Sequence, residues 1–353
     1  MSLLNGTSLE DSPMWTVYYS TFDEQCVSIA IRCRYKLFYI EILADDLGNW
    51  SRKQEILQLL HLASSDDNDA EESLYDLIWE QFVPLISTYA PPISNDSSLV
   101  SLQKFYGSEI LLFKLVGDGD DIKVTPCPYD LTKIANLRPQ INLGEIPDGS
   151  KVFHLDASHT TIKPRYSQDS DIASDTPAIV SLDDTPIHYH FKAVQGHSSF
   201  LREFRILLQL AENRLNKKYR LPTIHSLVFY SDMPDTVMGM LLHHIDSDGN
   251  MADWIDRRST PRGLREKWYH QIRDTVRALH RHGIVWGDVK PDNVLIDCDR
   301  NAWVIDFDGG FSSGYVDKDV METTEGDEQG VSRMGEELLN GKQYSLPSVG
   351  SHL

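Results

Sequence analysis

Four polar side chains of chemically useful types lie close together in the segments "GIVWGDVKPDNVLID" and "WVIDFDGG". Asp288, Lys290 and Asn293 lie in the first segment and Asp306 in the second, beside the apolar runs "NVLI" and "WVI". Transfer of a phosphoryl group needs a carboxylate that orients a hydroxyl and accepts its proton, and a lysine that neutralises charge. It also needs hard oxygen ligands for magnesium, which an amide and a second carboxylate can supply. These four residues match those roles.

The elements that must position this group begin with a long helix directly before it. The pattern predicts a helix that starts near Pro261, with Thr260 as N-cap and proline at the first helical position, and that stops at a C-cap glycine, Gly283. Its apolar stripe consists of Leu264, Trp268, Ile272, Val276 and Leu279. The polar loop therefore follows a helix and leads into two short strands.

Upstream of this helix the pattern changes to short strands. "HTTIKPR", "AIVSL" and "IHYHFKAV" predict strands, and the polar stretch "YSQDSDIASDTP" separates the first two. A helix follows, and "HSLVFY" and "TVMGMLLHH" predict two further strands. The apolar stripe of that helix consists of Phe200, Phe204, Leu207, Leu208 and Ala211.

The first 150 residues predict a small mixed α/β unit in which we find no chemistry. Alternating residues from Trp15 to Leu43 predict half-buried strands, and two helices are expected around "EILQLLHLA" and "SLYDLIWEQFVPLI". Ser51 and Gln54 resemble a capping box for the first helix. "EILLFKLVGDGDDIKV" predicts a hairpin that closes near Asp118-Gly119.

Composition limits the class of protein and its partners. The formal net charge of -20 argues against a surface built for nucleic acid or for anionic lipid, so neither partner is expected. The four cysteines form no C-x-x-C pair, which indicates a reducing compartment. The chain has no signal-like start and no apolar run long enough to span a bilayer. We expect an intracellular protein, cytoplasmic in the first place, with the nucleus as the open alternative.

"WGDVKPDNVLID" followed by "VIDFDGG" resembles the catalytic loop and the metal-binding segment of the protein kinase-like superfamily. The later stretch "GGFSSGYVDKDVMETTEGDEQGVSRMGEELL" is similar to a group of fungal kinase-like proteins, in which a short activation segment leads into an "EGD-x-x-G" helix start. The resemblance covers roughly residues 150–341 and is most specific in its second half.

The fold that this resemblance implies is α+β, a bilobal kinase-like fold with a β-rich small lobe and a truncated helical large lobe. We expect an N-terminal α/β extension of unknown role over residues 1–150 and the kinase-like domain over residues 151–341. Its small lobe would span about 151–242 and its large lobe about 246–341. Residues 342–353 would form a C-terminal tail.

The resemblance also implies a role for each polar residue of the loop. Asp288 would be the catalytic base, Lys290 the lysine that contacts the transferred phosphate, and Asn293 and Asp306 the metal ligands. Asp327, before the last helix, would brace the catalytic loop through backbone hydrogen bonds.

Five upstream residues would bind the nucleotide. Lys192 lies where the family places the lysine that holds the α and β phosphates, and Glu203 lies where the next helix supplies its ion-pair partner. The main chain near Leu242, His243 and His244 would meet the adenine.

Three features depart from the family pattern. Trp286-Gly287 replaces the usual His-Arg before the catalytic aspartate, which argues against activation through a phosphorylated loop. Asp308 follows Phe307 where the family has glycine. The glycine-rich loop is replaced by "YSQDSDIASDTP", which has three aspartates and no glycine and would repel phosphates.

The predicted function is that of an ATP- and Mg²⁺-dependent phosphotransferase of the protein kinase type, directed at Ser/Thr hydroxyls. Its partners would be ATP and an unknown protein or small-molecule phosphoacceptor. The alternative is a pseudokinase, which binds nucleotide or a partner without turnover. The glycine-free loop favours this alternative, and the intact set of Asp288, Lys290, Asn293 and Asp306 favours the enzyme.

Overall fold

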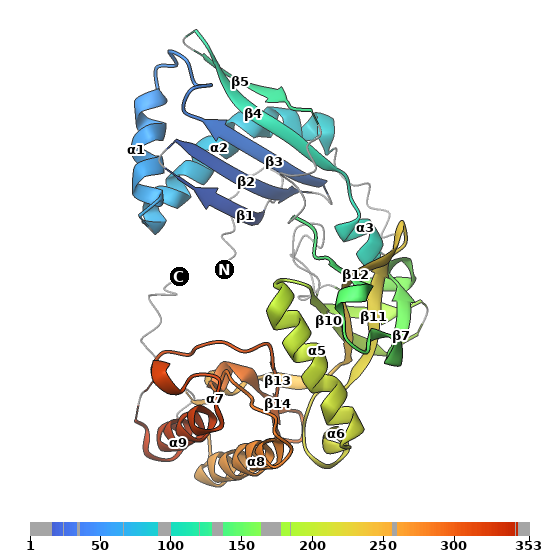
Figure 1. The fold of residues 1–353 in the computed structure, drawn as a ribbon. Helices are drawn as coiled ribbons and strands as arrows, with labels where there is room; N and C mark the ends of the chain where they lie inside the picture. Colours follow the sequence, from blue (N-terminus) through green and yellow to red (C-terminus); the bar gives the residue numbers. More distant parts are fainter. Residues whose placement is uncertain are drawn as a thin grey trace. The chain divides into compact units, whose positions relative to one another are not determined.

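The computed structural model in Figure 1 describes residues 16–23, 25–33, 36–65, 67–90, 100–119, 121–128, 137–163, 178–183, 185–255, 260–342 and 344. They divide into two compact units, each described separately below. Unit 1 holds the chain up to residue 140 with residues 156–187 and 229–234, and unit 2 holds residues 141–155, 188–228 and 235 onward. Among the described residues, no helix combines the length and the apolar character needed to cross a membrane.

Unit 1 is built on a five-stranded sheet with the strands in chain order. The strands are β1 (Thr16–Phe22), β2 (Cys26–Cys33), β3 (Lys36–Leu43), β4 (Ile110–Asp118) and β5 (Asp121–Pro126). Neighbours are antiparallel except β3 and β4, which pair in parallel. The predicted hairpin of β4 and β5 is confirmed, with its turn at Gly119 in the left-handed region.

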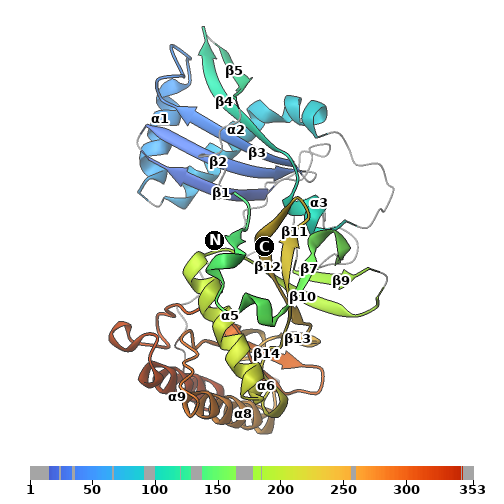
Figure 2. The same cartoon turned by 45° about the vertical axis from the view of Figure 1, so that its right-hand side comes forward.

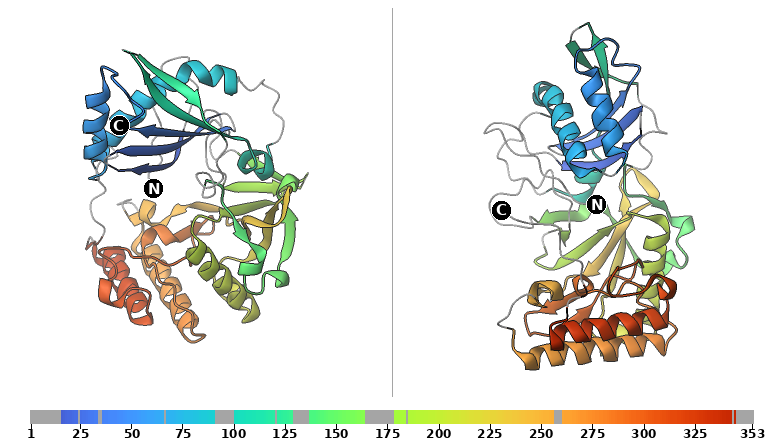
Figure 3. Two further views of the ribbon diagram at one scale, coloured as in Figure 1. Left: turned by 45° about the horizontal axis from the view of Figure 1, so that its top comes forward. Right: turned by 90° about the vertical axis from the view of Figure 1, so that its left-hand side faces the viewer.

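Two helices, α1 (Lys53–Ala63) and α2 (Asn68–Tyr89), cover one face of this sheet, as Figures 1 and 3 show. Both helices were expected from the sequence. The capping box at Ser51 is wrong, because α1 begins after Arg52, which makes no side-chain cap bond. Unit 1 also contains α3 (Leu102–Tyr106) and the antiparallel pair β8 (Thr160–Lys163) and β9 (Ile179–Leu182).

Unit 2 opens with a small β-rich part. Its strand order is β7 (Phe153–Asp156), β11 (Ile224–Tyr230), β12 (Met233–His243) and β10 (His188–Ala193), and β6 (Ile141–Asn142) also pairs with β12. Helix α5 (His197–Glu212) follows β10 and leads into the single turn α6 (Leu215–Lys218), as Figure 2 shows. The predicted stripe of α5 is buried at Phe200, Phe204 and Leu207, whereas Ala211 is exposed.

The rest of unit 2 is mainly helical. Helix α7 (Met251–Ile255) and the strands β13 (Ser247–Asn250), β14 (Val294–Asp297) and β15 (Ala302–Val304) surround the predicted catalytic loop. Helix α8 (Arg262–His280) lies beside α9 (Thr324–Asn340), as Figure 3 shows.

The predicted start of α8 is wrong by one position. Pro261 is its N-cap, and the Thr260 hydroxyl instead donates to the Trp254 carbonyl at 3.0 Å. The helix ends before Arg281, and Gly283 follows with a left-handed backbone, φ +69°. The chain therefore turns toward the polar loop where the sequence predicted.

The α+β fold class is confirmed by a sheet-rich N-terminal part and a helical C-terminal part. The domain boundaries near residues 150 and 341 stay predictions. Of the predicted tail, only Lys342 and Tyr344 are among the described residues.

Candidate active site

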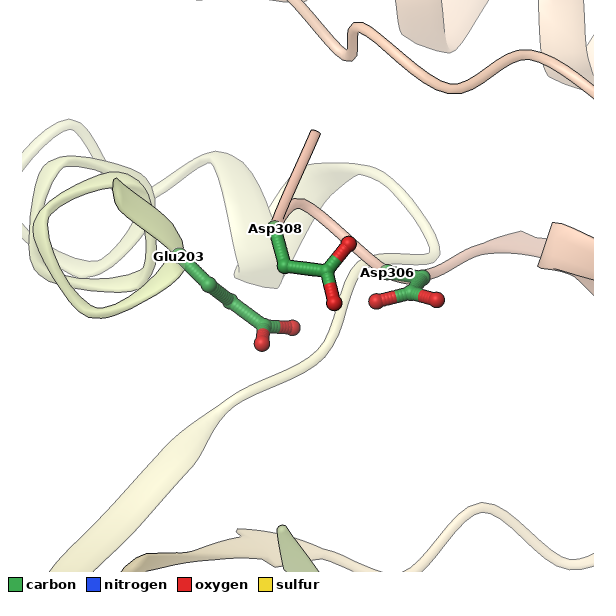
Figure 4. A group of neighbouring side chains, drawn as sticks. All are labelled: Glu203, Asp306 and Asp308. Atoms are coloured by element: carbon green, nitrogen blue, oxygen red, sulfur yellow. The ribbon is translucent and has the colours of Figure 1, made fainter. Parts of the chain in front are cut away.

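Lys192 lies at the centre of a group of three carboxylates. Its Nζ atom lies 2.6 Å from Glu203 Oε2, 2.5 Å from Asp306 Oδ1 and 3.5 Å from Asp308 Oδ2. Strand β10 supplies the lysine, α5 supplies Glu203, and the segment after β15 supplies both aspartates. Figure 4 shows the three acidic side chains converging. The structure therefore brings together the predicted pair Lys192–Glu203 and the predicted metal ligand Asp306.

Electrostatics favours a charged lysine in this group. Burial lowers the pKa of Lys192, but the negative charges of Glu203, Asp306 and Asp308 outweigh burial and raise it above its usual range. Burial raises the pKa of the Glu203 carboxyl against the opposing effect of Lys192. Burial also raises the pKa of Asp308, and the charge of Asp306 adds to this rise. One ammonium group thus pairs with three carboxylates. The excess negative charge could bind a metal cation.

The main chain at Asp306 is held in an unusual conformation. Its φ of +64° is in the left-handed region, which an aspartate adopts more easily than most residues. The buried Trp286 indole donates to the carbonyl oxygens of Ile305, at 2.9 Å, and Asp306, at 3.1 Å. Phe307, also buried, donates its N–H to Glu203 Oε1 at 3.4 Å. These contacts fix the direction of the Asp306 side chain.

Asp288 is the centre of a second polar group. Its Oδ2 atom accepts from Lys290 Nζ at 2.6 Å and from Asn293 Nδ2 at 2.9 Å, while its Oδ1 atom accepts from the Ser312 hydroxyl at 2.7 Å. The aspartate is 5% exposed, so these contacts and not water satisfy most of its charge. The structure therefore brings together Asp288, Lys290 and Asn293, as the sequence predicted.

The loop that carries Asp288 is held from α9. Asp327 accepts the backbone N–H groups of Trp286 and Gly287, both at 2.8 Å, and its Oδ2 atom lies 2.8 Å from His280 Nε2. The bracing role expected for Asp327 is confirmed in these two hydrogen bonds. Because Asp327 is buried, its charge strengthens them.

The two polar groups are neighbours along the same loop. A Cβ atom placed on Gly310 would lie 3.3 Å from the Asp288 carboxyl carbon, so the segment after Asp306 passes close to the predicted base. The Ile305 N–H donates to the Asn293 carbonyl at 3.1 Å. The acidic cluster that could hold a metal consists of Glu203, Asp306 and Asp308, among the residues described.

Of the three residues predicted to meet an adenine, Leu242 and His243 end β12 and His244 follows directly. Leu242 is buried and pairs with His190, and His243 pairs with Tyr189. The His243 N–H donates to the Thr223 carbonyl at 2.9 Å, so this donor is engaged within the protein. The adenine contact stays a prediction for all three residues. The glycine-free stretch "YSQDSDIASDTP" lies outside the described residues.

Two contacts within the candidate site escaped the analysis of the sequence. Arg202, directly before Glu203 on α5, donates to carbonyl oxygens of the catalytic loop and of the metal segment. Ser312 reaches Asp288 from the segment beyond Gly310. An arginine in an amphipathic helix and a serine in a polar segment carry no periodic signal, so only the glycines at 287 and 309 hinted at a close approach.

A comparison with known protein families agrees with this geometry. Residues 192–348 match the family described as Protein kinase domain. The matched segment contains all nine of the residues that the sequence assigned to the site. The likeness to the fungal group with a short activation segment stays a prediction. The match supports a bilobal kinase-like fold and a kinase-type phosphotransferase function with ATP, and residues 192–348 of this chain are thus similar to members of the protein kinase-like superfamily.

Proposed function

We propose that unit 2 is an ATP- and Mg²⁺-dependent phosphotransferase that acts on the hydroxyl groups of serine or threonine. The contact of the Ser312 hydroxyl with Asp288, at 2.7 Å, carries this proposal. An aliphatic hydroxyl already occupies the place from which a base accepts a proton, and Lys290 lies 2.6 Å from the same carboxylate. A substrate serine in the place of Ser312 would have its nucleophile oriented and a cation beside it.

Each side chain then has a role in the transfer. Asp288 orients the attacking hydroxyl and accepts its proton, and Lys290 neutralises charge on the moving phosphoryl group. Lys192, fixed by Glu203, holds the phosphates of the nucleotide. Asp306 would hold the metal, and the side-chain oxygen of Asn293, whose amide nitrogen donates to Asp288, would be a further ligand.

The residues fit Mg²⁺ in their chemistry. Glu203, Asp306 and Asp308 each offer a carboxylate oxygen, and these oxygens lie within 4.8 Å of one another. Mg²⁺ prefers such hard oxygen ligands. When bound, it would neutralise the phosphate oxygens that the three carboxylates would otherwise repel.

The second candidate function is a binding module without turnover. The observation that favours it is the internal neutralisation of Lys192, whose ammonium already contacts three carboxylates. A nucleotide would have to compete with Asp308 and Asp306 for this cation. For the proposed enzyme to bind ATP, the metal would have to bind Asp306 and Asp308, so that the Lys192 ammonium can contact the phosphates.

One experiment separates the two functions. ATP with Mg²⁺ at about 100 times its dissociation constant should stabilise the chain by about 2.7 kcal/mol in a thermal-shift titration. Asp288→Asn should keep this shift and lower turnover of ATP with a serine peptide by at least about a hundredfold. Asp292→Asn is the matched control, because Asp292 lies in the same loop and is exposed.

The outcomes are distinct. A shift without turnover in the wild type would favour the binding module. The absence of a shift at millimolar ATP would remove the enzyme and leave only a module that binds a partner without nucleotide. Equal turnover of Asp288→Asn and the wild type would remove Asp288 from the role of base.

A further inference from the structure

Arg202 joins three main-chain carbonyls that belong to two separate segments. Its guanidinium donates to Val285 O at 3.2 Å, to Trp286 O at 3.3 Å from both terminal nitrogens, and to Phe307 O. The first two carbonyls lie in the catalytic loop, and the third lies directly after Asp306. One side chain of α5 therefore ties together the segments that carry the proposed base and the proposed metal ligand.

Two glycines form the space that this guanidinium fills. Gly287 and Gly309 both have left-handed backbones, φ +89° and +87°. A Cβ atom on Gly287 would lie 2.4 Å from Arg202 Nη2. One on Gly309 would lie 2.4 Å from Glu322 Oε1 and 3.2 Å from Arg202 Nη1. The first distance is a severe overlap, so no other residue fits at position 287 while the guanidinium stays where it is.

The contacts of Arg202 differ from those of an ordinary surface arginine. Within the described ranges no carboxylate forms an ion pair with it, and each of its hydrogen bonds goes to a carbonyl oxygen. Its planar set of donors suits several acceptors at fixed angles, which a lysine cannot match. The side chain thus acts on the orientation of peptide groups.

The neighbouring residue completes this arrangement. Glu203 pairs with Lys192 and accepts the Phe307 N–H, while Arg202 binds the Phe307 carbonyl. Two adjacent residues of α5 therefore hold both polar groups of Phe307, immediately after Asp306. A shift of α5 would disturb the lysine, the metal ligand and the catalytic loop at once.

We propose that Arg202 is a positioning residue for phosphoryl transfer, which sets the catalytic loop and the metal segment in register through their carbonyl groups. This inference rests on the proposed function. It also explains why position 287 is glycine. The family pattern has an arginine at this position of the catalytic loop, and here the guanidinium of Arg202, on α5, supplies the positive charge instead. Arg202 touches neither the nucleotide nor the acceptor in this assignment.

The first test compares Arg202→Met with Arg205→Met, which removes an exposed arginine from the same helix. Turnover is measured as a function of free Mg²⁺, at a temperature where circular dichroism shows each variant folded. Arg202→Met should lower kcat by about ten- to hundredfold, as expected for misplaced catalytic groups, and raise the Mg²⁺ concentration for half-maximal turnover. Arg205→Met should change neither value.

A second test uses the space at Gly287. Gly287→Ala should lower kcat as Arg202→Met does, and the two changes combined should cost little more than either alone, because both displace the same guanidinium. Gly283→Ala is the matched control: its backbone is also left-handed, yet an added Cβ would meet nothing within 4 Å. Added guanidinium ion should partly restore turnover of Arg202→Ala and leave Arg205→Ala unchanged.

The results separate this inference from the proposed function. If the wild type turns over and Arg202→Met does so with the same kcat and the same Mg²⁺ dependence, the positioning role is wrong and the proposed function stands. Fully additive losses in the double variant would also overturn it. If the wild type shows no turnover, the proposed function fails and the positioning role fails with it. Should Arg202→Met not fold, Arg202→Lys replaces it in the same comparison.

Discussion

Asp306 combines an ion pair, a main-chain hydrogen bond and an unusual backbone conformation. Its carboxylate lies 2.5 Å from Lys192, its carbonyl accepts from Trp286, and its backbone is left-handed. Such a conformation costs about 1–2 kcal/mol for most residues, but less for aspartate and asparagine. A variant that tests its charge must therefore keep this backbone, and asparagine does so where alanine does not.

We expect Asp306→Asn to lose most of the effect of Mg²⁺ on ATP binding, because the negative charge that attracts the metal is gone. Thermal-shift titration with ATP, with and without Mg²⁺, measures this effect. Asp308→Asn is the matched comparison and should retain a clear Mg²⁺ effect, because the proposed assignment makes Asp306 the principal ligand. A Mg²⁺ effect of wild-type size in Asp306→Asn would show that Asp306 is not the principal ligand.

At the scale of elements, α8 and α9 depend on a close approach at Gly335. A Cβ atom there would lie 2.5 Å from the Tyr269 ring. We expect Gly335→Ala to destabilise the chain by about 1–3 kcal/mol in urea unfolding, because the added methyl group separates the helices. Gly263→Ala, on an exposed face of α8 with open space around it, should instead stabilise by up to about 1 kcal/mol through helix propensity. If both substitutions changed the free energy of unfolding in the same direction, this account of the packing would be wrong.

Histidines gather on neighbouring strands of unit 2. The ring of His225 on β11 lies 5.6 Å from that of His243 on β12 and 4.4 Å from that of Tyr189 on β10. Burial, and then His243, lowers the pKa of His225. The unfolded chain therefore takes up a proton first as the pH falls below about 6.5, so stability is present above this pH and lost below it.

The expected result is a melting temperature that falls between about pH 7 and pH 5.5, with a smaller fall in His225→Gln. His270→Gln, an exposed histidine of α8, serves as control and should melt like the wild type at each pH. Differential scanning calorimetry measures all three proteins. An identical pH dependence of His225→Gln and the wild type would exclude this histidine as the cause.

The elements of the site were predictable to different degrees. The polar residues of the catalytic loop follow each other within six positions, and a short loop between a helix and a strand leaves few ways to place them. Lys192, Glu203 and Asp306 meet across more than a hundred positions, and for these the sequence relied on resemblance. The hydrogen bonds of Arg202 could not be predicted, because they depend on the directions of three carbonyl groups. Those directions are set only when the loop folds.

Helix ends were less predictable than helices. Ser51 and Thr260 are common capping residues, yet α1 and α8 begin beside other residues. A single side-chain hydrogen bond contributes only about 1 kcal/mol, so packing elsewhere in the helix decides where it begins. The parallel neighbours β3 and β4 were also out of reach, since periodicity indicates a strand but not its partner.

At the scale of the whole molecule, the chain has a formal net charge of -20. The candidate site also has more carboxylates than lysines. Free ATP carries several negative charges, so both the net charge of the chain and the carboxylates of the site should repel it. Salt screens such repulsion over about 10 Å at 0.1 M ionic strength.

We therefore expect the dissociation constant of ATP in the presence of a chelator to fall as NaCl rises from about 0.02 to 0.15 M. With Mg²⁺ the dissociation constant should depend less on salt, because the complex carries less charge. Isothermal titration calorimetry measures both series. Weaker binding of free ATP at higher salt would instead indicate a positive field at the site.

The parallel pairing of β3 with β4 has a consequence for how unit 1 assembles during synthesis. Strands β1, β2 and β3 follow one another through short turns and can pair at once, whereas β4 joins only after α1, α2 and α3 have been made. Contacts between distant segments form slowly, because the chain between them must first be ordered. Until then β3 is an open edge of mostly buried residues, "KLFYIEIL". A nascent chain that pauses at this stage would leave the apolar edge of β3 exposed to other chains.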